Sequence, residues 1–192
     1  MDKLEIRKAY KKSRLKLDKA QIEIKSKLIA ENFIQNLLPK ITDFKNKKLA
    51  FYFAEGNESD PIHLIKYCQN LGNVCSLPKI QNNSKILEFK TYKVGDELIA
   101  NCKYSKLLEP QTAKDTIIPD IIFAPLVAFD DNLNRLGTGG GFYDTTITHL
   151  KEQNPELLFI GIAFEMQKCA NINTDTWDKK LDFLITEERI LF

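Results

Sequence analysis

The chain has 192 residues, of which 43% are hydrophobic and 28% charged, and its formal net charge is +2. These values are ordinary for a globular protein, and the length suits one domain with a core of its own. No run of eighteen apolar residues occurs, which excludes a transmembrane helix, and the charged N-terminus, MDKLEIRKAYKK, lacks the apolar stretch of a signal peptide.

The four cysteines are scattered and, with only two histidines, form neither a CxxC pair nor the ligand spacing of a zinc site. They are Cys68, Cys75, Cys102 and Cys169. Isolated thiols without a secretion signal favour a reducing compartment. We therefore expect a cytoplasmic protein whose cysteines pack in the core.

Charge is unevenly spread along the chain. Residues 1–48 carry fourteen Lys and Arg against six Asp and Glu, a net charge of +8, and the remainder carries −6. A basic segment can bind nucleic acid, an anionic membrane surface or a phosphorylated small ligand. The simpler alternative is a solvated helix face, and charge alone favours that alternative.

Residues 2–38 predict a helical segment with a break at Leu17-Asp18, where Asp18 would cap the second helix and Pro39 would end it. Apolar side chains follow the helical period at Ile6, Tyr10, Leu17, Ile22, Ile29, Phe33 and Leu37. One face of the first helix is basic, with Lys3, Arg7, Lys11 and Arg14 spaced by three or four residues.

Beyond residue 48 the pattern predicts strands that alternate with helices. Buried strands are expected at 49–54, 120–130 and 158–164, and further strands at 73–79, 86–92, 183–186 and 189–192. Helices are expected at 60–72 and 142–153. This alternation favours an α/β layered fold with a largely parallel sheet. Residues 81–119 give the weakest pattern.

The stretch NRLGTGGGFYD, residues 134–144, places four of the eight glycines of the chain between a strand and a helix. In an open α/β sheet this is the carboxyl end of a strand, and the helix N-terminus there suits a phosphate. Glycine lets an anion approach the backbone, and Arg135 adds charge. Neither a Walker motif nor a dinucleotide fingerprint is present, and a flexible turn is the simpler alternative.

Aspartates near this stretch indicate a possible metal. Asp144 follows the glycines, where a magnesium ion would relieve its repulsion of a bound phosphate; alternatively it stabilises the helix dipole. In WDKKLDFLITEE, Asp178 and Asp182 precede a buried strand and are candidates to share that metal. Ordinary surface turn residues would look the same. From the residues alone, the prediction is an α/β protein with a nucleotide–magnesium site.

The chain resembles the 5-formyltetrahydrofolate cyclo-ligase family along nearly its whole length. The resemblance lies in a collinear series: KLEIRKAYKKSR, FYFAEGNESD, LPKI, LLEP, PDIIFAPLVAFD, RLGTGGGFYD, GIAFEMQ and WDKKLDFLITEE. It implies a three-layer, Rossmann-like fold of the CoA-transferase-like type, one domain over residues 1–192, and a helical segment, 1–40, packed on its core. It also implies ATP- and magnesium-dependent cyclisation of 5-formyltetrahydrofolate to 5,10-methenyltetrahydrofolate, with phosphorylation of the formyl oxygen.

The resemblance implies roles for particular residues. It assigns ATP to Lys3, Arg7, Arg135, Leu136, Gly137, Thr138, Gly139, Gly140, Gly141, Phe142 and Tyr143. It assigns catalysis to Arg135 and Tyr143, the folate to Phe53, Glu58 and Tyr143, and magnesium to Asp144 and Asp182. The resemblance also implies small-molecule substrates, 5-formyltetrahydrofolate and ATP. It implies a monomer that binds neither nucleic acid nor a membrane.

Some positions depart from the family pattern. Phe142 stands where a second tyrosine is usual, and Thr138 and Gly140 stand where some members carry basic residues. KYSKLLEP lacks a glycine that is common in the family, which leaves the role of Glu109 open. Pro61 stands where a threonine is usual. Two rival functions are a nucleic-acid-binding module that uses the basic helix, and a nicotinamide-dependent oxidoreductase, which the missing fingerprint disfavours.

Overall fold

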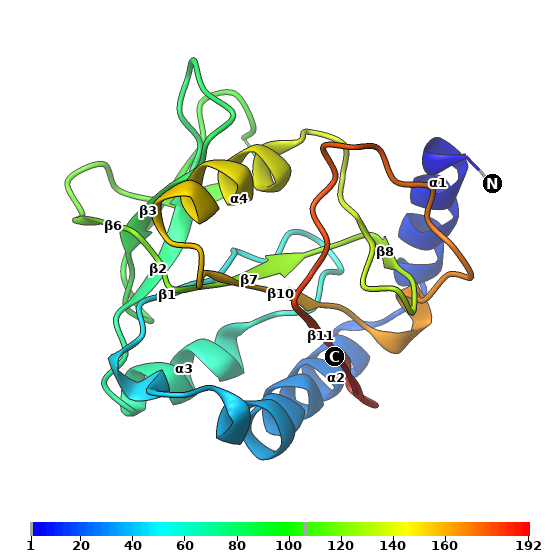
Figure 1. Ribbon diagram of the computed structural model, residues 1–192, viewed down its shortest axis with the longest axis horizontal. Helices are drawn as coiled ribbons and strands as arrows, with labels where there is room; N and C mark the ends of the chain where they lie inside the picture. The colour runs from blue at the N-terminus through cyan, green and yellow to red at the C-terminus, as the bar shows by residue number, and fades with distance from the viewer. Residues whose placement is uncertain (1, 106) are drawn as a thin grey trace.

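The computed structural model describes residues 2–105 and 107–192, and its centre is an eight-stranded sheet in the order β12-β11-β10-β7-β1-β2-β3-β6 (Figure 1). The strands are β1 (Leu49–Ala50), β2 (Cys75–Lys79), β3 (Glu88–Thr91), β6 (Thr116–Ile117), β7 (Ile121–Pro125), β10 (Leu158–Ile162), β11 (Phe183–Ile185) and β12 (Ile190–Leu191). The five strands from β11 to β2 are parallel, while β3, β6 and β12 are antiparallel at the edges. The predicted, largely parallel sheet is confirmed.

Helices cover both faces of the sheet and complete the three layers. They are α1 (Lys3–Arg14), α2 (Lys19–Asn32), α3 (Ile62–Asn70) and α4 (Phe142–Gln153), with short helical turns at Phe33–Leu37, Leu38–Lys40, Phe44–Asn46 and Glu165–Gln167. In Figure 1, α2 and α3 lie below the sheet and α4 lies above it. Two small hairpins stand apart from the sheet, β4 (Leu98–Ala100) with β5 (Leu108–Pro110), and β8 (Ala128–Phe129) with β9 (Arg135–Leu136).

The central strands are apolar throughout because a helical layer covers each face. On the side of α2 and α3, the ring of Phe123 stacks on Phe51 with centroids 4.7 Å apart and meets Phe33 edge-on at 5.4 Å. On the other side, Ile147 and the rest of the inner face of α4 pack against Phe159. Burial on both faces explains why these strands are continuous apolar runs in the sequence.

The order of the strands creates a crevice at the carboxyl edge of the sheet. β1 lies between β2 and β7, so the chain leaves β1 towards one side of the sheet and later returns on the other. Loops that follow two such strands turn away from each other, and open α/β sheets bind their ligands in the gap that results. Here these loops are residues 51–61 after β1 and 126–141 after β7.

The predicted break in the N-terminal helical segment is confirmed, and each helix begins with a capping box. Asp2 accepts a hydrogen bond from the Glu5 amide at the start of α1, and Asp18 accepts one from the Gln21 amide at the start of α2, both at 2.8 Å. Ile6 of α1 packs beside the β8–β9 hairpin rather than on the sheet. The first helix therefore lies beside the carboxyl edge of the central strands (Figure 1).

Several sequence expectations differ from the structure. The strand expected at 49–54 pairs only over Leu49–Ala50, because the chain then turns into the loop that borders the crevice. β4, β5 and β6 within 81–119, and β9, were not predicted. Cys102 is exposed, whereas the other three cysteines are buried as expected. Within the described ranges, no helix has the length and apolar character needed to cross a membrane.

Replacing Asp18 with alanine removes the acceptor that satisfies the first turn of α2. We expect Asp18→Ala to lower the free energy of unfolding by about 1 kcal/mol, measured by urea denaturation. Asp18→Asn retains a side-chain oxygen and is the matched control, with an expected loss of only a few tenths of a kcal/mol. Equal losses in the two variants would contradict the capping role.

Candidate functional site

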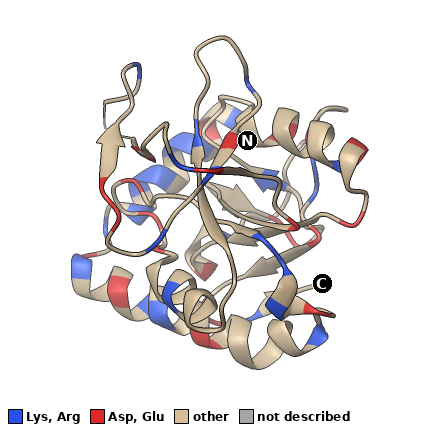
Figure 2. Cartoon of the chain, turned by 90° about the vertical axis from the view of Figure 1, so that its left-hand side faces the viewer, with Lys and Arg blue, Asp and Glu red and all other residues tan. Residues whose placement is uncertain are grey.

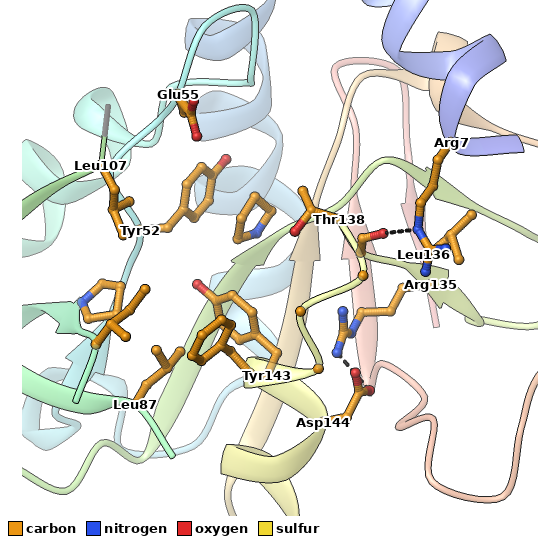
Figure 3. Close-up of a pocket in the computed structure, with 18 of the residues that line it drawn as sticks. Arg7, Tyr52, Glu55, Leu87, Leu107, Arg135, Leu136, Thr138, Tyr143 and Asp144 are labelled. Carbon is orange, nitrogen blue, oxygen red and sulfur yellow. Dashed lines mark hydrogen bonds and ion pairs between the residues drawn. The ribbon is translucent and has the colours of Figure 1, made fainter. Parts of the chain in front are cut away.

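A cavity of about 510 Å³ occupies the crevice between the loops that follow β1 and β7. One half is charged and is lined by Lys3, Arg7, Arg135, Asp144, Asp175 and Asp178. The other half is aromatic and apolar and is lined by Tyr52, Phe53, Pro78, Ile80, Leu87, Tyr104, Leu107, Phe142 and Tyr143. Figure 3 shows the glycine-rich stretch between the two halves, with Tyr52, Leu87 and Leu107 on one side and Arg7 and Asp144 on the other.

The glycines are required by the path of the backbone here. Gly139 has φ +108° and Gly141 has φ +74°, in the left-handed region that side chains disfavour, and Gly141 is the N-cap of α4. A Cβ on Gly139 would lie 3.5 Å from the Arg7 guanidinium carbon. Arg7 therefore lies against bare backbone, and the N-terminus of α4 opens on the cavity beside it.

The charges that flank the glycines pair with each other across the loop. Arg135 Nη2 donates to Asp144 Oδ1 at 2.8 Å, and the Lys179 amide donates to the same oxygen at 3.0 Å. The guanidinium also lies over the rings of Phe159 and Tyr143, at 4.9 and 5.7 Å from their centroids. Burial lowers the pKa of Arg135, and the ion pair with Asp144 opposes that effect. The arginine side chain is only 4% exposed, so its position is fixed by these contacts.

The basic face of α1 turns towards the cavity. Arg7 Nε donates to the Gly137 carbonyl at 2.8 Å and so fixes the helix to the glycine loop. Lys3 Nζ lies 2.6 Å from carboxylate oxygens of both Asp175 and Asp178. In Figure 2, basic and acidic residues are interspersed along the helices at the bottom of the view.

Glu58 and Tyr143 form the polar part of the aromatic half. Glu58 Oε2 accepts a hydrogen bond from the Glu55 amide at 3.1 Å, and Oε1 lies 3.4 Å from Arg14 Nη2. Burial raises the pKa of Glu58, although Arg14 opposes this. Burial, and then the charge of Glu58, also raise the pKa of the Tyr143 hydroxyl. A buried carboxylate with apolar walls can accept hydrogen bonds from a flat, N–H-bearing ligand.

The structure brings together all but one of the residues that the sequence singled out for the site. Lining the cavity are Lys3, Arg7, Phe53, Glu58, Arg135, Leu136, Gly137, Thr138, Gly139, Gly140, Gly141, Phe142, Tyr143 and Asp144. Asp182 lies elsewhere: its Oδ2 accepts from the Phe159 amide at 2.7 Å and lies 3.2 Å from Lys151 Nζ, in the last turn of α4. Asp144 is in the first turn of the same helix, so the two carboxylates face opposite ends of α4.

Of the two aspartates that precede β11, the one that lines the cavity with Asp144 is Asp178, four residues before Asp182; Asp175 lines it as well. The hydrogen bonds of Asp144 run through Oδ1 and those of Asp178 through Oδ2, which leaves one oxygen on each for another ligand. Among residues 2–105 and 107–192, no group of three or more His, Cys, Asp or Glu could hold a metal. Magnesium commonly uses one or two carboxylates with water and substrate phosphates, so this pair fits it.

Sequence reasoning missed most of the aromatic wall. Tyr52, Leu87, Tyr104 and Leu107 lie in loop segments outside the strands, and nothing in their local patterns sets them apart from core residues. Trp177 was detectable in principle, because a tryptophan beside Asp178 in a polar segment is unusual. It is 65% exposed and lines the cavity.

Glu109, whose role the sequence left open, does not line the cavity. It is 2% exposed and accepts hydrogen bonds from the Ile80 amide at 2.7 Å and Asn101 Nδ2 at 2.9 Å. These contacts tie the β4–β5 hairpin to β2, so Glu109 supports the apolar wall from behind.

Comparison with known proteins gives a consistent result. The sequence model of the 5-formyltetrahydrofolate cyclo-ligase family matches residues 1–187. A 5-formyltetrahydrofolate cyclo-ligase of Haemophilus influenzae is 32% identical over 161 residues, covering 81% of this chain and 84% of the relative. One from Mus musculus is 28% identical over 170 residues, covering 84% and 79%.

Solved structures agree with the sequence matches. The NMR structure of Aquifex aeolicus 5,10-methenyltetrahydrofolate synthetase superposes with a TM-score of 0.80 at 26% identity, covering 99% of this chain and 92% of that one. A Mycoplasma pneumoniae 5,10-methenyltetrahydrofolate synthetase has the same fold, with a TM-score of 0.76 at 23% identity, covering 97% and 99%. The cavity, its glycine loop and these full-length matches lead to one conclusion: the chain belongs to the 5-formyltetrahydrofolate cyclo-ligase family.

Proposed function

We propose that this chain is an enzyme that converts 5-formyltetrahydrofolate to 5,10-methenyltetrahydrofolate, using ATP and magnesium and releasing ADP and phosphate. The observation that carries the proposal is a single cavity whose charged and aromatic halves meet at the glycine loop. The charged half suits phosphates and the aromatic half suits a pterin. Because one chain supplies the lining residues, a monomer suffices for this reaction, and we propose that it works in the cytoplasm.

The nucleotide phosphates would lie against the glycine loop. Gly139 and Gly140 present backbone without side chains, the N-terminus of α4 adds its positive dipole end, and Arg7 and Arg135 supply fixed charge. Thr138 and Gly140 carry no charge, so the backbone, the two arginines and Lys3 would neutralise the phosphates in this protein. Arg135 is held in place before any ligand arrives, which avoids a reorganisation cost during the reaction.

The folate would occupy the aromatic half. Glu58 is placed to accept hydrogen bonds from pterin N–H groups, and Phe53, Tyr52 and Tyr143 border the space for the rings. Phe142 forms an edge-on contact with Tyr104, with ring centroids 6.4 Å apart, so its ring packs in the wall. This contact needs no hydroxyl, which explains how phenylalanine serves where the family pattern has tyrosine.

The chemistry requires the two ligands to meet. The formyl oxygen attacks the γ-phosphorus of ATP, a new O–P bond forms, and the bond from phosphorus to the leaving ADP oxygen breaks. The neighbouring folate nitrogen, which does not carry the formyl group, then attacks the carbon of the phosphorylated formyl group and loses its proton. The C–O bond breaks and phosphate leaves with the former formyl oxygen. Arg135 and Tyr143, at the junction of the halves, would orient the formyl group and stabilise phosphoryl charge.

Asp144 and Asp178 would hold the magnesium ion. When bound, the metal supplies charge neutralisation for the transferred phosphoryl group. The protein's own contribution is to fix Asp144 through Arg135 and the Lys179 amide, so that its second oxygen remains available at the cavity. Asp182, bound by Lys151 and the Phe159 amide, has a structural role between α4 and β10.

The first prediction concerns the reaction itself. Purified protein mixed with MgATP and 5-formyltetrahydrofolate should produce the absorbance of methenyltetrahydrofolate, with ADP formed in equal amount. Omitting ATP should abolish the product. Absence of product under these conditions, or equal product without ATP, would contradict the proposal.

The second prediction tests the glycine loop. Gly139→Ala should raise the KM for ATP about tenfold or more, since the methyl group strains the backbone at φ +108° and takes up space beside Arg7 where we propose that the phosphates bind. The matched control is Gly72→Ala, at φ +94° with nothing within 4 Å of the added Cβ. Both variants should lose about 1–3 kcal/mol of stability. An unchanged KM in Gly139→Ala would remove the loop from the nucleotide site.

The third prediction separates the two aspartates. Asp178→Asn should raise the magnesium concentration needed for half-maximal turnover about tenfold, because a carboxylate ligand becomes a weaker amide. Asp182→Asn should leave that concentration unchanged and lower only the melting temperature. The reverse pattern, with magnesium dependence altered in Asp182→Asn alone, would restore the sequence-based assignment.

A further inference from the structure

We propose that Lys3 is a positioning residue that occupies the magnesium carboxylate in the nucleotide-free protein, so that the metal enters the site only together with its nucleotide. This inference rests on the proposed function and extends it to the order of binding. Its subject is the ion-pair cluster of Lys3, Asp175 and Asp178, which joins α1 to the loop before β11 at the charged half of the cavity.

The geometry of the cluster is fixed from both sides. Lys3 is the first residue of α1, whose start is held by the capping box of Asp2 and Glu5 and whose buried Ile6 anchors the first turn. Opposite it, the Asp175 amide donates to Asp178 Oδ2 at 2.8 Å, the oxygen that also lies 2.6 Å from Lys3 Nζ. The lysine therefore reaches a preformed acidic turn.

Electrostatics makes the lysine and a metal ion competitors. The ammonium of Lys3 lies 2.6 Å from a carboxylate oxygen of Asp175 and 2.6 Å from one of Asp178, so its charge is already paired with the carboxylate proposed to hold the metal. A magnesium ion bound by Asp178 and Asp144 would face this ammonium within a few ångströms. Magnesium alone must either bind at the free oxygen of Asp178 against the repulsion of this ammonium or displace Lys3, and in both cases nothing else offsets the added charge.

A nucleotide removes the conflict. Its phosphates give Lys3 a new anionic partner and give the metal additional oxygen ligands, so the ammonium can leave Asp178 as the metal arrives. Asp175 is the more exposed carboxylate, at 46% against 20% for Asp178, and remains available to keep Lys3 at the cavity. Arg7 takes no part in the exchange, because its Nε is engaged with the Gly137 carbonyl. The lysine thus prevents magnesium from filling the site without ATP.

The test measures magnesium binding in the absence of ATP and folate, by titrating MgCl₂ into nucleotide-free protein in a calorimeter. Lys3→Met should bind magnesium about tenfold more tightly than the unaltered protein. Lys3→Arg keeps the positive charge and should bind as weakly as the unaltered protein. Lys8→Met is the matched control, since it removes the same charge from an exposed position on the same helix.

Further variants keep the outcome decisive. Adding Asp178→Asn to Lys3→Met should abolish the gain, which places the new binding at Asp178. Lys3→Gln should reproduce the gain, and it replaces the methionine variant if circular dichroism shows that variant to be misfolded. Equal magnesium affinity in Lys3→Met and the unaltered protein, or an equal gain in Lys8→Met, would overturn the inference. ATP-dependent cyclisation would then still stand, because turnover by the unaltered protein is measured separately.

Discussion

The reversal of strand order between β1 and β7 is the constraint on which the site depends. It places the loop after β1 and the loop after β7 on opposite sides of one crevice, and the first carries Phe53 and Glu58 while the second carries the glycines. The strands themselves can be wholly apolar because helices cover both faces, so polar residues gather only where the strands end. The division of the cavity into an aromatic half and a charged half follows from this topology.

Each positively charged side chain that lines the site has a partner within the protein. Arg135 is held by Asp144, Lys3 by Asp175 and Asp178, and Arg7 by a main-chain carbonyl. A buried or half-buried charge without such a partner would destabilise the fold. Under the proposed function the arginines would remain in position when phosphate arrives, whereas the lysine would change partners. Three charges of the basic N-terminal segment are thus explained by the site that α1 borders, because Lys3 and Arg7 line the cavity and Arg14 pairs with Glu58.

Much of this could be predicted from the sequence, and the exceptions have physical causes. The bounds 142–153 of α4 were predicted correctly because glycines mark its start and the apolar period is clear. Asp178 and Asp182 could not be distinguished, because only tertiary structure decides which of two aspartates before a strand points to the cavity and which pairs with Lys151 in the last turn of α4. The roles of Phe53 and Glu58 came from the family resemblance, since locally they look like core and loop residues. The hairpin of β4 and β5 has short strands, half exposed, that carry no regular alternation.

The central claim is that this cavity brings the γ-phosphate of ATP to the formyl oxygen of the folate. The most direct measurement follows that oxygen, using 5-formyltetrahydrofolate labelled with ¹⁸O in the formyl group and mass spectrometry of the phosphate released in one turnover. The account predicts one ¹⁸O atom in each phosphate, because the C–O bond breaks after the O–P bond has formed. Unlabelled phosphate, with the ¹⁸O recovered in water, would contradict phosphorylation of the formyl group and with it the arrangement of ligands proposed for the two halves of the cavity.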